Sequence, residues 1–217
     1  MVMVETTDRT DWRREDLHVS VRDPAAASMN FLNEVAARFP DAVSLAAGRP
    51  YDGFYTAADI DRYLRVFRDH LAGRGLPEAA IDRTLLQYGR TNGVIGDLIS
   101  RTLALDEGIE VPADAVMVTA GCQEAMVVAL RGLCAGPDDV VLAVEPCYVG
   151  LTGAARILGI EVVPVPEARD GLDPAAVLRV AREVRDSGRR ARALYVVPNF
   201  ANPSGVSMPV ATRRRRR

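Results

Sequence analysis

The segment VTAGCQEAM, residues 118–126, carries the clearest chemical signal in the chain. An apolar run ends at Thr119, Ala120 and Gly121 form a tight turn, and a helical pattern begins near Cys122. Amide N–H groups and the positive end of the helix dipole meet at such a point and suit an anion such as a phosphate. An ordinary strand-to-helix turn would give the same pattern. The segment is neither a dinucleotide fingerprint nor a P-loop, since GxGxxG and GK[ST] are both absent.

Cys122 is a candidate nucleophile, because thiols at helix N-termini can be reactive. The only histidines that could act as its base, His18 and His70, lie far from it in the sequence. A structural cysteine, or one that offers only its backbone N–H, is therefore the interpretation we adopt. The three cysteines form no disulfide or zinc pattern, and no other set of residues has metal-ligand spacing.

Three further segments carry side chains that could contact a planar ligand. Tyr148 in EPCYVG follows a strand pattern and could lie over a ring, or it could be a core aromatic at the end of the sheet. Asn202 in VVPNFANPSG could donate an amide hydrogen bond to a ligand oxygen, although Asn-Pro is also ordinary turn chemistry. Tyr88 lies in the glycine-flanked loop LQYGRTNG.

The elements that must position these residues change in character near residue 115. Before it, apolar spacing predicts helices after Pro24 and at about 56–72, 78–87 and 93–106. After it, the apolar runs AVMVT, VVLAVE, EVVPV and ALYVVP predict strands that alternate with helices. One of these helices has Asp173 as its N-cap and Pro174 in its first turn. The pattern indicates an α/β fold with a mostly parallel sheet covered on both faces.

Composition narrows the class of protein. The chain has 217 residues, 48% of them hydrophobic, and all 27 basic residues are arginine, so it contains no lysine. Five arginines end the chain, which leaves 22 basic against 29 acidic residues elsewhere; this acidic body argues against nucleic-acid binding. No apolar run is long enough for a membrane span, and the N-terminus does not resemble a secretory signal. We expect a cytoplasmic protein.

Taken together, GRP near residue 48, QYG at 87–89, GCQEA, EPCYVG and PNFANPSG resemble the class I/II aminotransferases, which are fold-type-I enzymes dependent on pyridoxal 5′-phosphate. The likeness runs from about residue 24 to 212 and covers the N-terminal half of that family. Within the family, these segments are most similar to the 3,5-dihydroxyphenylglycine transaminases of nonribosomal peptide antibiotic pathways. The resemblance implies amino-group transfer between an amino acid and a 2-oxo acid, with an arylglycine as a possible product.

The resemblance also assigns roles to residues. Gly121, Cys122 and Gln123 would hold the cofactor phosphate through backbone N–H groups, Tyr148 would stack on the pyridine ring, and Asn202 would hydrogen-bond its phenolic oxygen. Cys122 departs from the small hydroxylated residue common at its position, which preserves a backbone role but removes a hydroxyl contact.

Two more roles depend on a dimer and on the substrate. Family active sites lie at a homodimer interface, so Tyr88 would reach the phosphate of the neighbouring subunit's cofactor. Gly48 would lie beside the substrate carboxylate. No metal site and no nucleic-acid or membrane partner is implied.

The family's lysine, which holds the cofactor as a Schiff base and moves the proton, follows NPSG in family order, as do an acidic residue and an arginine. None of them is in this chain, so we expect a truncated chain without transaminase activity. A noncovalent cofactor-binding remnant, one half of a split enzyme and an unrelated Rossmann-type nucleotide binder remain as alternatives.

The expected organisation has four parts. Residues 1–23 are a flexible arm, 24–55 a helix and loop at the rim of the active site, and 56–212 the first half of the cofactor-binding large domain. The arginine run, 213–217, replaces an expected amphipathic helix, and we interpret it as the result of a frame shift or truncation.

Overall fold

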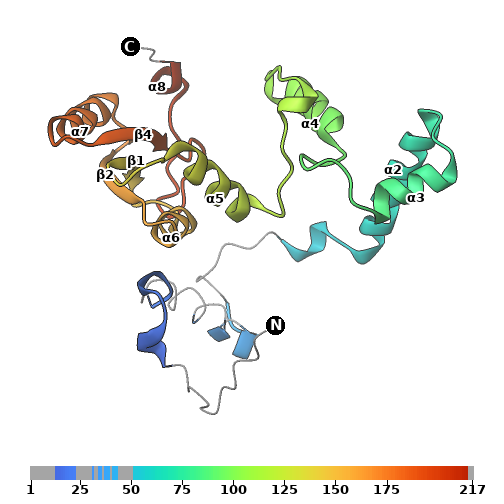
Figure 1. The fold of residues 1–217 in the computed structure, drawn as a ribbon, viewed down its shortest axis with the longest axis horizontal. Coiled ribbons are helices and arrows are strands. Elements are labelled where there is room, and N and C mark those ends of the chain that lie inside the picture. Colours follow the sequence, from blue (N-terminus) through green and yellow to red (C-terminus); the bar gives the residue numbers. More distant parts are fainter. Residues whose placement is uncertain are drawn as a thin grey trace, which may run out of the picture. The chain divides into compact units, whose positions relative to one another are not determined.

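The computed structural model describes residues 13–22, 31, 34, 35, 37–39, 41–43 and 51–214 (Figure 1). It divides into two compact units, one of Met1–Phe31 with Gly121–Arg217 and the other of Leu32–Ala120. The boundaries expected at residues 23, 55 and 212 stay predictions. Of the helix expected after Pro24, the described residues between 31 and 38 are helical.

The unit of residues 32–120 contains helices joined by turns and loops, and its described residues include no strand. Its main helices are α2 (Ala57–Gly73), α3 (Glu78–Leu86) and α4 (Gly96–Thr102). The first begins with a capping box, in which both the amide and the hydroxyl of Thr56 donate to the Asp59 carboxylate, at 3.0 and 2.7 Å. The helix expected at 93–106 begins at Gly96 and becomes a π-helix over Leu103–Glu107.

The other unit is built on a four-stranded sheet of order β3-β2-β1-β4. The strands are β1 (Asp139–Glu145), β2 (Glu161–Ala168), β3 (Gly171–Leu172) and β4 (Arg190–Tyr195). β1 is central and runs parallel to both β2 and β4, whereas the short β3 pairs antiparallel with β2. The predicted mostly parallel sheet is therefore confirmed.

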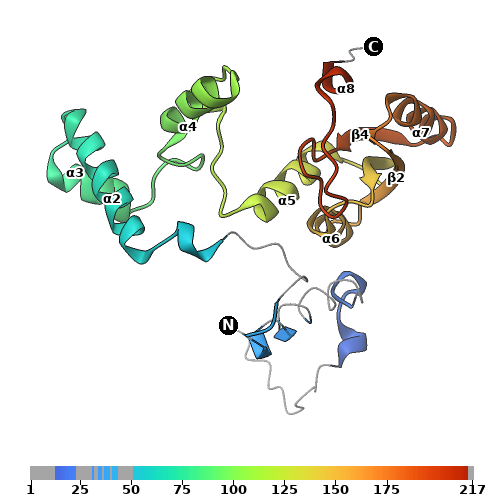
Figure 2. The same ribbon diagram turned by 180° about the vertical axis from the view of Figure 1, so that it is seen from behind.

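Helices cover both faces of this sheet (Figures 1 and 2). They are α5 (Cys122–Leu133), α6 (Val149–Ile157) and α7 (Pro174–Asp186). The side chains of β1 alternate between the faces, as a strand requires: Val141 and Ala143 pack with α5 and α6, whereas Val140 and Leu142 pack with α7. Burial on both faces explains why VVLAVE is a continuous apolar run. The predicted cap of α7 is also present, since Asp173 accepts a 2.9 Å hydrogen bond from the amide of Ala175.

The prediction of a strand at residues 115–119 is wrong. These residues are not part of the sheet; the amide of Val118 donates to the carbonyl of Asn92, and the side chain of Met117 is 58% exposed. A strand needs a neighbouring strand to satisfy its backbone groups, and the described residues of the unit of residues 32–120 include no strand. The apolar run predicted the extended conformation but could not supply a partner.

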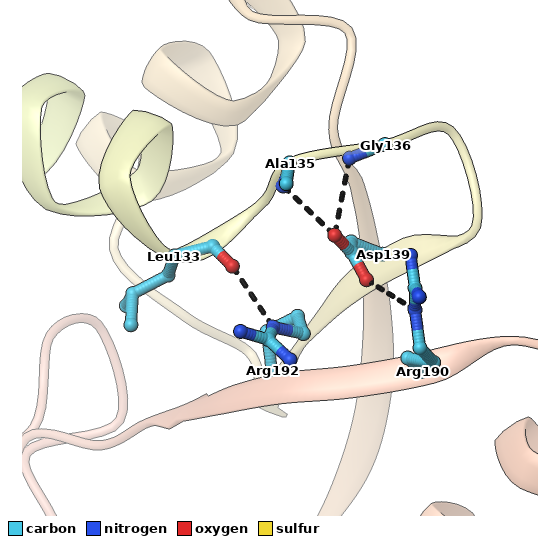
Figure 3. Close-up of polar contacts among 6 residues, drawn as sticks. All are labelled: Leu133, Ala135, Gly136, Asp139, Arg190 and Arg192. Carbon is cyan, nitrogen blue, oxygen red and sulfur yellow. Dashed lines mark hydrogen bonds and ion pairs between the residues drawn. The ribbon is translucent and has the colours of Figure 1, made fainter.

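A buried carboxylate joins the start of the central strand to the edge of the sheet (Figure 3). Asp139 accepts hydrogen bonds from the amides of Ala135 (2.8 Å) and Gly136 (3.1 Å) and from Nε of Arg190 (2.8 Å). Burial alone would raise the pKa of Asp139, but the two amides and the guanidinium outweigh it and hold the pKa below its usual range. Arg192, on the same strand β4 as Arg190, donates to the carbonyl of Leu133 at the end of α5 (2.9 Å). These contacts fix β4 against β1 and α5.

Candidate functional site

Two of the segments with predicted roles meet through a hydrogen bond between side chains. Nε2 of Gln123, in the first turn of α5, lies 3.0 Å from the hydroxyl oxygen of Tyr148 and donates to it. Tyr148 is the N-cap residue of α6, directly after the loop that leaves β1. Because α5 and α6 pack on the same face of the sheet, their N-termini bring these residues together although 25 positions separate them.

Two glycines give this arrangement its shape. Gly121, before α5, has φ 140° and ψ 168°, a conformation that strains any residue with a Cβ. Gly150, in the first turn of α6, has no side chain to occupy the place where Gln123 and Tyr148 lie. A Cβ at that position would be 2.8 Å from Cζ of Tyr148 and closer still to its Cε1 and to Nε2 of Gln123. The tyrosine ring and the glutamine amide can therefore lie against the start of the helix only because residue 150 is glycine.

A pocket lies beyond the carboxyl ends of β1 and β4, where ligands of open α/β sheets bind. Its lining includes Cys147 from the loop after β1, Tyr195 from the end of β4 and Asn202 from the loop that follows. The structure thus brings Asn202 to the same sheet edge as the segment that contains Tyr148.

Tyr195 is a residue of this region that the sequence reasoning missed. Burial raises the pKa of its phenol, and the neighbouring Cys122, Cys147 and Tyr148 raise that pKa further. These electrostatic interactions come from two segments, the start of α5 and the loop between β1 and α6, so both lie near the phenol at the end of β4. The sequence placed Tyr195 inside the predicted strand ALYVVP, whereas the observed strand β4 ends at Tyr195, and only that earlier end brings the phenol to the edge of the sheet.

The thiol of Cys147, at this edge of the sheet, is not activated as a nucleophile. Burial, and then the charge of Glu145, raise the pKa of Cys147 above its ordinary value. All three cysteines are free. Within the described part of the chain, no three His, Cys, Asp or Glu side chains are grouped closely enough to hold a metal ion.

Two predicted site residues are not joined to this arrangement. Tyr88 belongs to the unit of residues 32–120, and its side chain is fully exposed. Gly48 lies outside the described residues. The roles assigned to both stay predictions, as do the cofactor contacts of Gly121, Cys122, Gln123, Tyr148 and Asn202.

Comparison with known proteins decides the family. Residues 42–214 match the family model for aminotransferase class I and II. The chain belongs to this family. The resemblance read from the five motifs is therefore confirmed, and the alternative of an unrelated Rossmann-type nucleotide binder was wrong.

Among relatives of this aminotransferase chain, the (S)-3,5-dihydroxyphenylglycine transaminase of Amycolatopsis orientalis is 48% identical over 207 residues, which are 95% of the chain and 47% of the relative. Aromatic-amino-acid aminotransferase 1 of Thermococcus litoralis is 26% identical and is covered over 40% of its length. The chain spans about half the length of the curated relatives it matches.

Solved structures show the same partial fold. An archaeal alanine:glyoxylate aminotransferase superposes with a TM-score of 0.72 at 22% identity, over 92% of this chain and 48% of that one. The kynurenine aminotransferase of Pyrococcus horikoshii, solved in complex with PMP, superposes with a TM-score of 0.71 at 24% identity. The match covers 92% of this chain and 46% of that one. Among the described helices of the aminotransferase chain, none combines the length and apolar character that a membrane crossing needs.

Proposed function

We propose that the carboxyl edge of this sheet is one side of a pyridoxal 5′-phosphate site in an enzyme that transfers amino groups between an amino acid and a 2-oxo acid. The hydrogen bond from Gln123 to Tyr148 carries this proposal, since it links the helix start expected to hold the phosphate to the ring expected to stack on the pyridine.

The residues present fit the cofactor. Cys122 and Gln123 lie in the first turn of a 12-residue helix, where backbone N–H groups have no acceptor inside the helix and favour an anion. Tyr148 is half-buried and its hydroxyl is held by Gln123, so its ring is oriented before any ligand arrives. Asn202 is exposed in the pocket lining and can donate its amide to a ring oxygen.

Each of these residues would contact a different part of the cofactor. The backbone of Gly121, Cys122 and Gln123 would anchor the phosphate, Tyr148 would fix the plane of the ring, and Asn202 would stabilise negative charge on the phenolic oxygen. The bound cofactor supplies the electron sink that makes the substrate Cα–H acidic. Tyr195, with its raised pKa, would remain protonated as a hydrogen-bond donor at this edge.

For the substrate, we favour an arylglyoxylate-type 2-oxo acid that yields an arylglycine for antibiotic biosynthesis. The support is the 48% identity with the Amycolatopsis (S)-3,5-dihydroxyphenylglycine transaminase. We also propose a homodimer, in which the exposed Tyr88 of one subunit would contact the phosphate in the other. The free cysteines favour a cytoplasmic location.

This 217-residue chain would bind the cofactor noncovalently and would not turn over by itself. It contains no lysine, so no side-chain amine can attach the cofactor or carry the proton between substrate and cofactor. If the protein works as two polypeptides, addition of one that carries the lysine-bearing half would restore amino transfer. Turnover of glutamate and an arylglyoxylate by the purified chain alone would contradict this.

Calorimetric titration of the chain with pyridoxal 5′-phosphate, and separately with pyridoxal, tests the site. We expect binding of the phosphate form, and about 5- to 10-fold weaker binding by Tyr148→Ala, because the stacking contact is lost. Tyr63→Ala is the matched control, since Tyr63 is an exposed tyrosine on α2. Equal affinity for both ligands, or equal binding by the two variants, would refute the proposed site.

A further inference from the structure

The loop that carries Asn202 is closed at its base by an arginine from the end of the chain. The amide of Met208 donates to the carbonyl of Pro198 (2.9 Å), so residues 198 and 208 are the two ends of this loop. Arg213, in the short helix α8 (Val210–Arg214), adds its guanidinium to that base. Its Nε and one terminal nitrogen donate to the carbonyl of Met208, at 2.9 and 2.8 Å.

The same guanidinium reaches the other end of the loop. The same terminal nitrogen also donates to the carbonyl of Pro198 (3.0 Å) and to Oδ1 of Asn199 (2.6 Å), so its two N–H groups are shared among three acceptors. One side chain therefore holds acceptors from both ends of the loop. An arginine suits this task because its donors are held in a rigid plane and its charge strengthens each hydrogen bond. A lysine ammonium offers no such fork.

The far part of the loop is held separately. Ser204 donates through its hydroxyl to Oε1 of Glu167 at the end of β2 (2.8 Å), and the amide of Ala201 donates to the carbonyl of Val206 (2.9 Å). Asn202 lies between these contacts and lines the pocket with Cys147 and Tyr195. Its place at the pocket depends on a loop that is fixed at its base and near its tip.

We infer that Arg213 is a positioning residue, which clasps the loop of residues 198–208 and so holds Asn202 at the proposed cofactor pocket. This inference rests on the proposed function for the role of Asn202, but the clasp itself rests only on the contacts of Arg213. The sequence alone did not predict these four hydrogen bonds, because Arg213 is the first of five identical residues.

Two measurements on the 217-residue chain test the inference. In the first, amide hydrogen exchange is compared for the wild type, Arg213→Ala, Arg213→Lys and Arg214→Ala. Arg214 is the control, being the neighbouring exposed arginine of α8. We expect the protection of the amides of residues 201 and 208 to fall about ten-fold or more in Arg213→Ala, as the loss of charged hydrogen bonds implies. Arg213→Lys should recover only part of it, whereas millimolar guanidinium should restore protection in Arg213→Ala alone. Circular dichroism confirms that each variant remains folded.

In the second, pyridoxal 5′-phosphate affinity is measured for Arg213→Ala, Asn202→Ala and the double variant. If Arg213 acts through Asn202, the double variant binds no more weakly than Asn202→Ala. Unchanged loop protection in Arg213→Ala, or additive losses of affinity, would overturn the inference. If Asn202→Ala itself leaves the affinity unchanged, the proposed role of Asn202 fails, and the exchange data alone then decide whether the clasp exists.

Discussion

Replacement of Gly150 by alanine separates the stability of α6 from the geometry of the site. The new Cβ would come within 2.8 Å of Cζ of Tyr148 and still closer to Nε2 of Gln123. Both obstacles are the ends of side chains, so they can move aside while the helix stays in place. The tyrosine ring would turn away and the 3.0 Å hydrogen bond between Gln123 and Tyr148 would break.

The substitution has two effects of opposite sign on the free energy of unfolding: a gain in helix stability and the loss of a hydrogen bond. Alanine in place of glycine stabilises a helix by about 0.5–1 kcal/mol, because the unfolded chain loses freedom. Loss of one hydrogen bond costs about 0.5–1.5 kcal/mol. We therefore expect the free energy of unfolding of Gly150→Ala to change by less than about 1 kcal/mol. Its affinity for pyridoxal 5′-phosphate should fall about 5- to 10-fold, since a displaced ring cannot stack.

Gly153→Ala is the matched control. Gly153 lies in the same helix, and a Cβ there would meet no atom within 4 Å. It should gain the helix contribution alone and bind the cofactor as the wild type does. Urea unfolding followed by circular dichroism gives the stabilities, and calorimetry gives the affinities. If Gly150→Ala binds as tightly as Gly153→Ala, the reasoning that residue 150 sets the position of the ring is refuted.

Two further predictions concern the unit that contains the sheet. Asp139 has a pKa below its unfolded value of 3.8, so between the two values the unfolded state binds more protons and stability rises with pH. When the free energy of unfolding is measured against pH, this contribution should be present above about pH 4 and lost as the pH falls through the lowered pKa of Asp139. Asp139→Asn should flatten that part of the curve. An unchanged slope in the variant would contradict the assignment to Asp139. Leu151→Ala, at a side chain 2% exposed on α6, should lower the free energy of unfolding by about 2–5 kcal/mol, whereas Leu178→Ala, 53% exposed on α7, should lower it far less. Equal losses in urea unfolding would contradict the assigned core.

The sequence predicted what depends on local pattern. The apolar runs at 140–145 and 161–165 and the cap at Asp173 follow from neighbouring residues, and each is present. The run at 115–119 failed because strand pairing depends on residues far along the chain. For the site, Tyr148 could be found from its place after a strand. Its bond to Gln123 could not, because it requires knowing that α5 and α6 pack on one face.

Arg213 shows the same limit more sharply. In the sequence it is the first of five identical residues, and nothing in that run distinguishes it from the others. Only the return of the chain past Met208 places its guanidinium against the loop of residues 198–208. Three of its four hydrogen bonds go to backbone carbonyls, which any residue type provides, so the sequence at those positions does not reveal the contact.

The central position of β1 has a consequence for how the chain folds during synthesis. Both partners of β1 come later in the chain: Val140 pairs with Glu161, and Asp139 pairs with Arg190, 51 residues further on. As the chain leaves the ribosome, β1 therefore has no strand partner on either side until β2 and then β4 have been made. Pairings of such sequence separation are slow, because loop entropy is lost before contacts form. During that interval α5 and α6 can cover Val141 and Ala143, but the face of Val140 and Leu142 stays exposed until α7 has been made, so translation pausing before α7 would prolong its exposure to aggregation.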